Sequence, residues 1–111
     1  MTNDYIAPII ARLTYNGATN LVGTLRHPDP DYPDMINGRQ RIYTGFGKWT
    51  TIAAQGVENH LIALGLAEPK KVGEDRLFEI LCITPLGREV AEYVDHAWDD
   101  VAPNLRDCSQ R

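Results

Sequence analysis

A segment that contains glycine and lysine, residues 45–50, has the composition of loops that hold phosphate groups through backbone amides. The nucleotide-binding spacing G-x-x-x-x-G-K-[ST] is not met, because Ile42 stands at the first glycine position and Trp49 follows the lysine. What remains is a glycine-flanked segment that leads into a predicted helix, with Lys48 beside it. This arrangement suits a DNA phosphate or an acidic patch on a protein, and a loop with solvated cations is the alternative.

The other candidate chemical groups do not form a recognisable site. His27, Asp29, Asp31 and Asp34 lie in one loop that lacks the glycine and the terminal glutamate of a calcium loop, and one histidine does not make a zinc site. We therefore predict a solvated acidic loop and no metal. No triad, carboxylate pair or nucleotide fingerprint is present, so we predict neither an enzyme nor a cofactor.

The two cysteines, Cys82 and Cys108, are far apart and form no C-x-x-C pair. We expect Cys82 in the core and Cys108 as an exposed thiol, both free in a reducing cytoplasm. No stretch is apolar for long enough to span a membrane, and the first residues lack the basic start of a signal peptide. These features predict a cytoplasmic protein that does not enter a membrane.

The charge distribution points to one face that could meet a polyanion. The 111 residues carry a formal net charge of -4, which argues against a protein that coats nucleic acid without specificity. Residues 36–76 nevertheless hold six basic and four acidic side chains. The basic ones are Arg39, Arg41, Lys48, Lys70, Lys71 and Arg76. Ordinary variation in solvated surface charge is the alternative interpretation.

Apolar periodicity predicts the elements of the N-terminal half. A helix is expected over residues 5–15, with Asn3 as its cap and Gly17 at its end, and a weaker helix over residues 20–26. Residues 27–36 are rich in proline and aspartate and are predicted to be a loop. Residues 35–49 show no sustained period and are predicted to be a long connection.

The C-terminal half has stronger signals. A helix is expected from Thr50 or Thr51 to residue 63, with Gly65 at its end. Strands are expected over residues 67–72 and 76–83, joined by a turn at 73–75. A last helix begins with Thr84 as cap and Pro85 at the first helical position, and it extends to about residue 98.

The sequence resembles a winged helix-turn-helix domain over residues 50–98. The resemblance lies in Val57-x-x-x-Leu61-x-x-x-Gly65-Leu66, in the turn at residues 73–76, and in the run from residue 83 to residue 89. It is similar to bacterial transcriptional regulators of the MarR and PadR type. The resemblance implies an α+β fold with a three-helix core, a two-stranded wing hairpin and a C-terminal helix.

The resemblance also implies roles for individual residues. The third helix would read double-stranded DNA, so Thr51, Gln55 and Asn59 become candidate contacts in the major groove. The basic residues of the middle segment would hold phosphates. The last helix would form a homodimer, with Tyr93 and Trp98 at the interface.

Residues 51–63 contain no arginine or lysine, which departs from the usual composition of a DNA-reading helix. Two functions therefore stay open. The first is a small DNA-binding transcriptional regulator, and the second is a winged-helix module that binds a protein partner, as an adaptor or a phage-type inhibitor of a host complex. In either case we expect one domain over residues 1–102, followed by a polar tail over residues 103–111.

Overall fold

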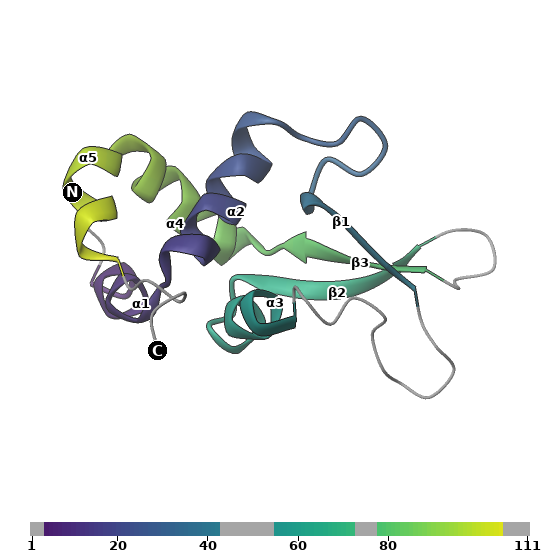
Figure 1. Ribbon diagram of the computed structural model, residues 1–111, viewed down its shortest axis with the longest axis horizontal. Coiled ribbons are helices and arrows are strands. Elements are labelled where there is room, and N and C mark those ends of the chain that lie inside the picture. Colours follow the sequence, from purple (N-terminus) through teal and green to yellow (C-terminus); the bar gives the residue numbers. More distant parts are fainter. Residues whose placement is uncertain (1–3, 43–54, 73–77, 106–111) are drawn as a thin grey trace.

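The computed structural model describes residues 4–42, 55–72 and 78–105, with the backbone alone for residues 37–42, 55–58 and 78. These residues form helices beside a three-stranded antiparallel sheet, which confirms the predicted α+β class (Figure 1). The elements in chain order are α1 (Ile6–Arg12), α2 (Tyr15–Arg26), β1 (Met35–Ile42), α3 (Gln55–Ala63), β2 (Ala67–Val72), β3 (Phe78–Ile83), α4 (Pro85–His96), α5 (Trp98–Val101) and the 3-10 helix η2 (Ala102–Asn104).

The N-terminal helix prediction was wrong at its C-terminal end. The chain leaves the helix at Leu13, and Thr14 begins a second helix by accepting a hydrogen bond from the Gly17 amide at 3.0 Å. Gly17 is therefore inside α2, where an added Cβ would lie 3.2 Å from a methyl group of Leu61. The predicted cap Asn3 lies outside the described residues. The glycine marks a close approach between α2 and α3, and a threonine cap divides α1 from α2.

The predicted connection over residues 35–49 was wrong at its beginning, because Met35–Ile42 is strand β1. The Pro/Asp loop therefore ends at Asp34, before the predicted residue 36. β1 pairs with β3, which gives the strand order β1-β3-β2. The pairing is irregular: Met35 faces Cys82 and Gln40 faces Ile80. Between these two pairs β1 contains more residues than β3, as at a β-bulge. This irregularity explains why no period-2 alternation is visible in the sequence.

The two sides of the sheet contact different apolar clusters. The main cluster joins α1, α2, α3 and α4 to one side of the sheet. Its fully buried side chains include Leu13, Leu21, Ile36, Leu61, Leu66, Leu81, Val90 and Val94. A smaller cluster of Met35, Ile80 and Cys82 lies on the other side. Residues 80–83 of β3 thus alternate between the two clusters, and the predicted core position of Cys82 is confirmed.

The end of the chain is helical for longer than predicted. α5 and η2 follow α4, and Leu105 packs against the main cluster. Residues 103–105 of the predicted polar tail are thus in contact with the helices. None of the described helices is long and apolar enough to cross a membrane.

The junction between α3 and α4 follows the two capping signals seen in the sequence. Gly65 has the positive φ of 78° that ends α3, and Thr84 accepts a hydrogen bond from the Gly87 amide at 2.9 Å to begin α4. The Thr84 hydroxyl also donates to the Gly65 carbonyl oxygen at 2.7 Å, and the Thr84 amide donates to that of Leu66 at 3.1 Å. These bonds hold the two helix ends together at the base of the β2–β3 hairpin.

Gly87→Ala should destabilise the protein by about 2 kcal/mol, because overpacking costs roughly 1–3 kcal/mol. A Cβ at this position would lie 2.0 Å from the Leu66 carbonyl oxygen, so two backbone segments would have to separate. Guanidinium unfolding followed by circular dichroism measures the change. The matched control is Gly23→Ala in α2, at the edge of a surface pocket, where the helix preference of alanine should leave stability equal or higher. Equal stability of the two variants would contradict the close contact.

Cys82 should react with Ellman's reagent at least about tenfold more slowly in the native protein than in guanidinium. The side chain is 4% exposed, and burial raises the pKa of its thiol because the charged thiolate is poorly solvated. A folded-state pKa above the unfolded one also means that stability falls as the pH rises above the unfolded value. A Cys108→Ser variant makes Cys82 the single thiol measured. Equal rates in the two conditions would show that Cys82 is accessible.

Candidate nucleic-acid interface

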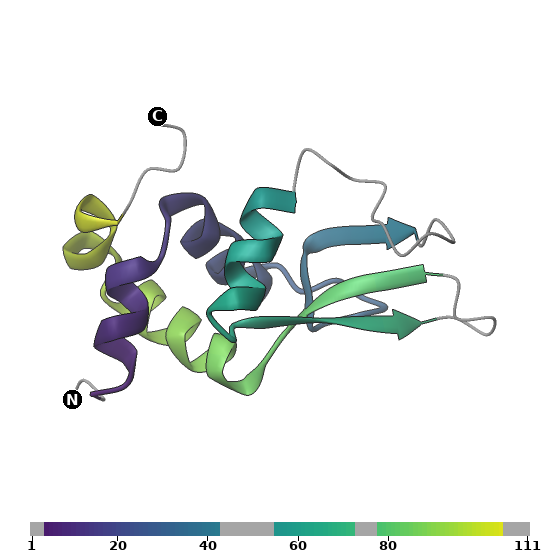
Figure 2. The same ribbon diagram turned by 90° about the horizontal axis from the view of Figure 1, so that it is seen from below.

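Four of the predicted phosphate-binding residues lie on the outer strands of the sheet. We call Arg39, Arg41, Lys70 and Lys71 the strand cations; the first two belong to β1 and the last two to β2. Since β3 lies between β1 and β2, residues far apart in the sequence share one sheet. Figure 2 shows the three strands running side by side away from the helices. The strand cations therefore lie on the sheet, which extends away from the end of the molecule formed by α1, α2, α4 and α5 (Figure 2). We call that end the helical end.

The strand register sets the spacing of these positions. Arg41 pairs with Glu79 of β3, and Glu79 pairs with Lys71 of β2, so the three form one row across the sheet. Gln40, Ile80 and Lys70 form the next row. Neighbouring strands are roughly 4.8 Å apart, which separates the Cα atoms of Arg41 and Lys71 by about 10 Å. Because successive strand residues face opposite sides of a sheet, Arg41 and Lys71 share one side with the carboxylate of Glu79 between them, whereas Lys70 belongs to the side of Ile80 and Cys82.

β2 is an edge strand with a polar surface. Glu68, Pro69, Lys70 and Lys71 are all exposed, whereas Ala67 at the base of the strand is buried. Lysine and proline on an edge strand also prevent pairing with another chain, which is a purely structural reason for their presence. Glu79 is half-buried and contributes a negative charge between the cations. The row thus has a net positive charge of one.

The predicted DNA-reading helix is only partly visible. α3 begins at Gln55, and Asn59 is exposed one helical turn later. The fully buried side chain of Leu61 anchors α3 in the core. The helix contacts both α2 and β2. Thr51, Lys48 and Arg76 lie outside the described residues, so their predicted roles stay predictions.

Tyr93 on α4 and Trp98 on α5 are the residues predicted for a dimer interface. Both are half-buried and pack against the main cluster of their own chain. Trp98 also forms a tilted ring contact with Tyr15, with the ring centroids 5.6 Å apart. Part of each side chain is therefore used within the monomer, and the dimer contact stays a prediction.

Two arginines of the helices, Arg26 and Arg88, are bound to carboxylates. Arg26 on α2 contacts Asp95 on α4, with a shortest N–O distance of 2.5 Å, and Arg88 on α4 contacts Asp34 in the Pro/Asp loop. Both bridges are largely exposed, so each contributes about 1 kcal/mol or less. The Arg26–Asp95 bridge neutralises charge between α2 and α4, and the Arg88–Asp34 bridge does so where β3 leads into α4.

Carboxylates of the Pro/Asp loop hold the loop in its conformation. The Asp29 carboxylate accepts hydrogen bonds from the amides of Asp31 and Tyr32 at 2.9 Å each, which closes a local turn. With Asp34 bound to Arg88, two of the three carboxylates hold the loop in place. Within the described part of the chain, no group of three or more histidine, cysteine or acidic residues is arranged to hold a metal ion.

Sequence analysis alone did not place Arg39 and Arg41 beside Lys70 and Lys71, nor Glu79 between them. The signal for Glu79 was present, because it is a single charge within an apolar strand and so marks where one side of β3 leaves the core. The pairing of β1 with β3 had no local signal.

No protein-family model matches the sequence, no curated protein matches it, and no solved structure matches the fold.

Proposed function

We propose that the protein binds double-stranded DNA as a winged-helix domain and acts as a small transcriptional regulator. The observation that supports this most is the strand register, which places Arg41 of β1 and Lys71 of β2 in one row across the sheet although they are distant in the sequence. The order of α3, the β2–β3 hairpin and α4, with β1 as a third strand, is compatible with the winged-helix interpretation.

The strand cations would contact the DNA backbone. Arginine and lysine bind phosphates through charge-assisted hydrogen bonds, and their long side chains extend the reach of a row about 10 Å wide. Phosphate contacts supply affinity and register but carry no sequence information. Because β1 and β2 both pair with β3, the distance between the phosphate contacts of β1 and those of β2 would be fixed.

Sequence recognition would come from α3. Gln55 and Asn59 are one turn apart, and glutamine and asparagine side chains can each pair with an adenine edge in the major groove. Because α3 ends at the base of β2, a helix contact and a strand contact would be made together on one duplex. The net charge of -4 opposes long-range attraction, so binding would depend on this one local surface.

Lys70→Ala combined with Lys71→Ala should lower DNA affinity and make it less sensitive to salt. Each phosphate contact contributes about 0.9 to the slope of log affinity against log salt, so about four to six contacts give a slope near -4 to -5. The loss of two contacts should make this slope shallower by about 2. Fluorescence anisotropy measures this with two labelled duplexes, one from upstream of the gene and one scrambled.

The matched control is Arg12→Ala combined with Arg26→Ala, which removes the same charge from helices α1 and α2. Its slope should equal that of the unaltered protein. No binding of the unaltered protein to either duplex at low salt would disprove DNA binding, and equal losses in both double variants would disprove the role of the strands.

Glu79→Gln should raise DNA affinity by about threefold to tenfold at low salt, because it removes the carboxylate at the centre of the basic row. The same anisotropy titration measures the change. The control is Glu68→Gln, which removes an exposed carboxylate nearer the base of β2 and should have a smaller effect. A fall in affinity with Glu79→Gln would contradict the proposed phosphate contacts.

A protein partner is the second candidate function, and one observation favours it: α3 holds Glu58 and no lysine or arginine. Such a helix offers no cation to a DNA phosphate and repels it through Glu58, whereas its polar side chains can hydrogen-bond to a protein surface. In this case the protein would act as an adaptor or as a phage-type inhibitor of a host complex. Absence of DNA binding together with a stoichiometric partner in a pull-down would support it over the regulator.

A further inference from the structure

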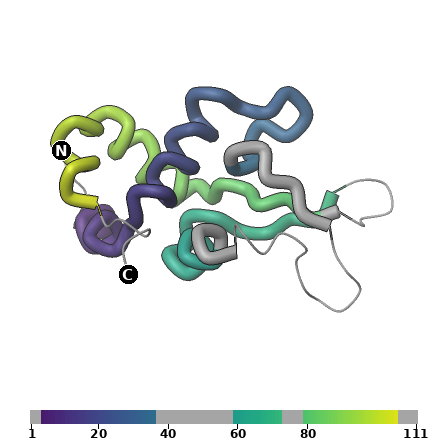
Figure 3. The backbone as a smooth tube through the Cα atoms, viewed as in Figure 1, coloured from purple at the N-terminus to yellow at the C-terminus, as the bar shows by residue number. Residues whose placement is uncertain are grey.

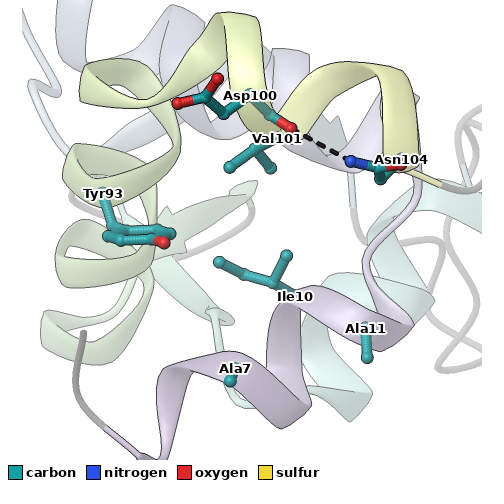
Figure 4. Close-up of a pocket in the computed structure, with 7 residues that line it drawn as sticks. All are labelled: Ala7, Ile10, Ala11, Tyr93, Asp100, Val101 and Asn104. Carbon is teal, nitrogen blue, oxygen red and sulfur yellow. Dashed lines mark hydrogen bonds between the residues drawn. The ribbon is translucent and has the colours of Figure 1, made fainter.

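A pocket of about 310 Å³ lies between α1 and the C-terminal helical turns. It is lined by Ala7, Ile10 and Ala11 from α1, by Tyr93 from α4, and by Val101 and Asn104 from the last turns (Figure 4). Figure 3 shows α1 beside this end of the chain, at the opposite end of the molecule from the strand tips. The volume is at the lower end of the range of small-molecule sites.

The floor and sides of the pocket are apolar. Ala7 and Ala11 are one helical turn apart and exposed, so their small side chains leave space above α1. Ile10 and Val101 are partly buried and pack against the main cluster, which fixes the two sides. Figure 4 shows Val101 directed toward Ile10 across the space. The shape is thus set by side chains that the core holds in position.

Two uncharged polar side chains line the pocket, those of Tyr93 and Asn104. In Figure 4 the Tyr93 hydroxyl points into the space between Ile10 and Val101. None of the hydrogen bonds among the described residues involves this hydroxyl. The side-chain nitrogen Nδ2 of Asn104 donates to the backbone carbonyl oxygen of Asp100 at 3.1 Å. The side-chain oxygen of Asn104 can then act as an acceptor at the rim of the pocket.

The charges at the pocket exclude anions. Neither lysine nor arginine is among its described lining residues, and its one charged side chain is the carboxylate of Asp100. In Figure 4 this carboxylate is turned away from the space, so it would repel an anion at the entrance without meeting a bound cation. A buried carboxylate or phosphate on a ligand would have no counter-charge here.

We propose that this pocket binds a small uncharged aromatic molecule that carries one N–H or O–H group. The ring lies over Ala7 and Ala11 between Ile10 and Val101, and the polar hydrogen is donated to the Tyr93 hydroxyl oxygen. This proposal goes beyond DNA binding and does not depend on it, because it concerns the opposite end of the molecule.

The first test is a titration of the ¹⁵N-labelled protein with indole, followed by backbone NMR. Indole is neutral and has one N–H donor. Saturable shifts should concentrate at Ile10, Ala11, Tyr93 and Val101, and indole-3-carboxylate should bind at least tenfold more weakly. Shifts spread over the surface, or equal affinity for the carboxylate, would overturn the proposal.

Two variants test the geometry. Ala11→Leu fills the space from an exposed helix position and should weaken indole binding at least tenfold, whereas Ala63→Leu, at an exposed position on α3, should leave it within twofold. Tyr93→Phe removes only the hydroxyl. It should weaken indole binding by about threefold to tenfold but leave unchanged the binding of benzofuran, which has the same shape and no N–H.

Equal effects of Tyr93→Phe on indole and benzofuran would show that the hydroxyl does not orient the ligand. Unaltered indole binding by Ala11→Leu would place the ligand elsewhere. All these measurements are made without DNA, so a failure of the proposed DNA binding leaves their outcome unaffected.

Discussion

Close backbone contact at the junction of α3 and α4 is the constraint on which the rest of the structure depends. The carbonyl oxygens of Gly65 and Leu66 accept hydrogen bonds from Thr84, and Gly87 leaves room for the Leu66 carbonyl. This contact joins the beginning of β2 to the end of β3. It therefore sets the angle at which the hairpin leaves the helices, and with it the position of Lys70 and Lys71 relative to α3. A winged-helix interpretation requires this relation between helix and hairpin.

The charges of the molecule are separated between its two ends. At the helical end Arg26 and Arg88 are bound to Asp95 and Asp34, which are distant in the sequence. The strands carry basic positions on both outer edges of the sheet. A protein with a net charge of -4 can therefore still hold basic positions close together on one sheet, because its excess of carboxylates lies elsewhere in the chain. The pocket beside Tyr93 lies among the helices, and its lining is mostly apolar.

Sequence reasoning succeeded where a signal was local and failed where it depended on distant residues. The Gly65 end of α3, the Thr84-Pro85 start of α4 and the β2–β3 pairing all follow from residues within a few positions of each element. Gly17 misled the prediction, because a glycine that admits Leu61 looks in sequence like a glycine that ends a helix. β1 depends on a distant partner strand and has an irregular register, so no local period indicated it. The Tyr93 pocket likewise exists only once α1 and the last turns are packed together.

The pairing of β1 with β3 has a consequence for the order in which the fold assembles. β2 and β3 are neighbours in the chain, so their hairpin closes a short loop, whereas β1 reaches β3 only after α3 and β2 have been passed. Pairing across a long separation pays its loop-closure entropy before it gains contacts, and it is correspondingly slow. The hairpin with Lys70 and Lys71 is thus expected to form early, and the strand with Arg39 and Arg41 to join it late. The strand cations would therefore all lie on one sheet only in the last stage of folding.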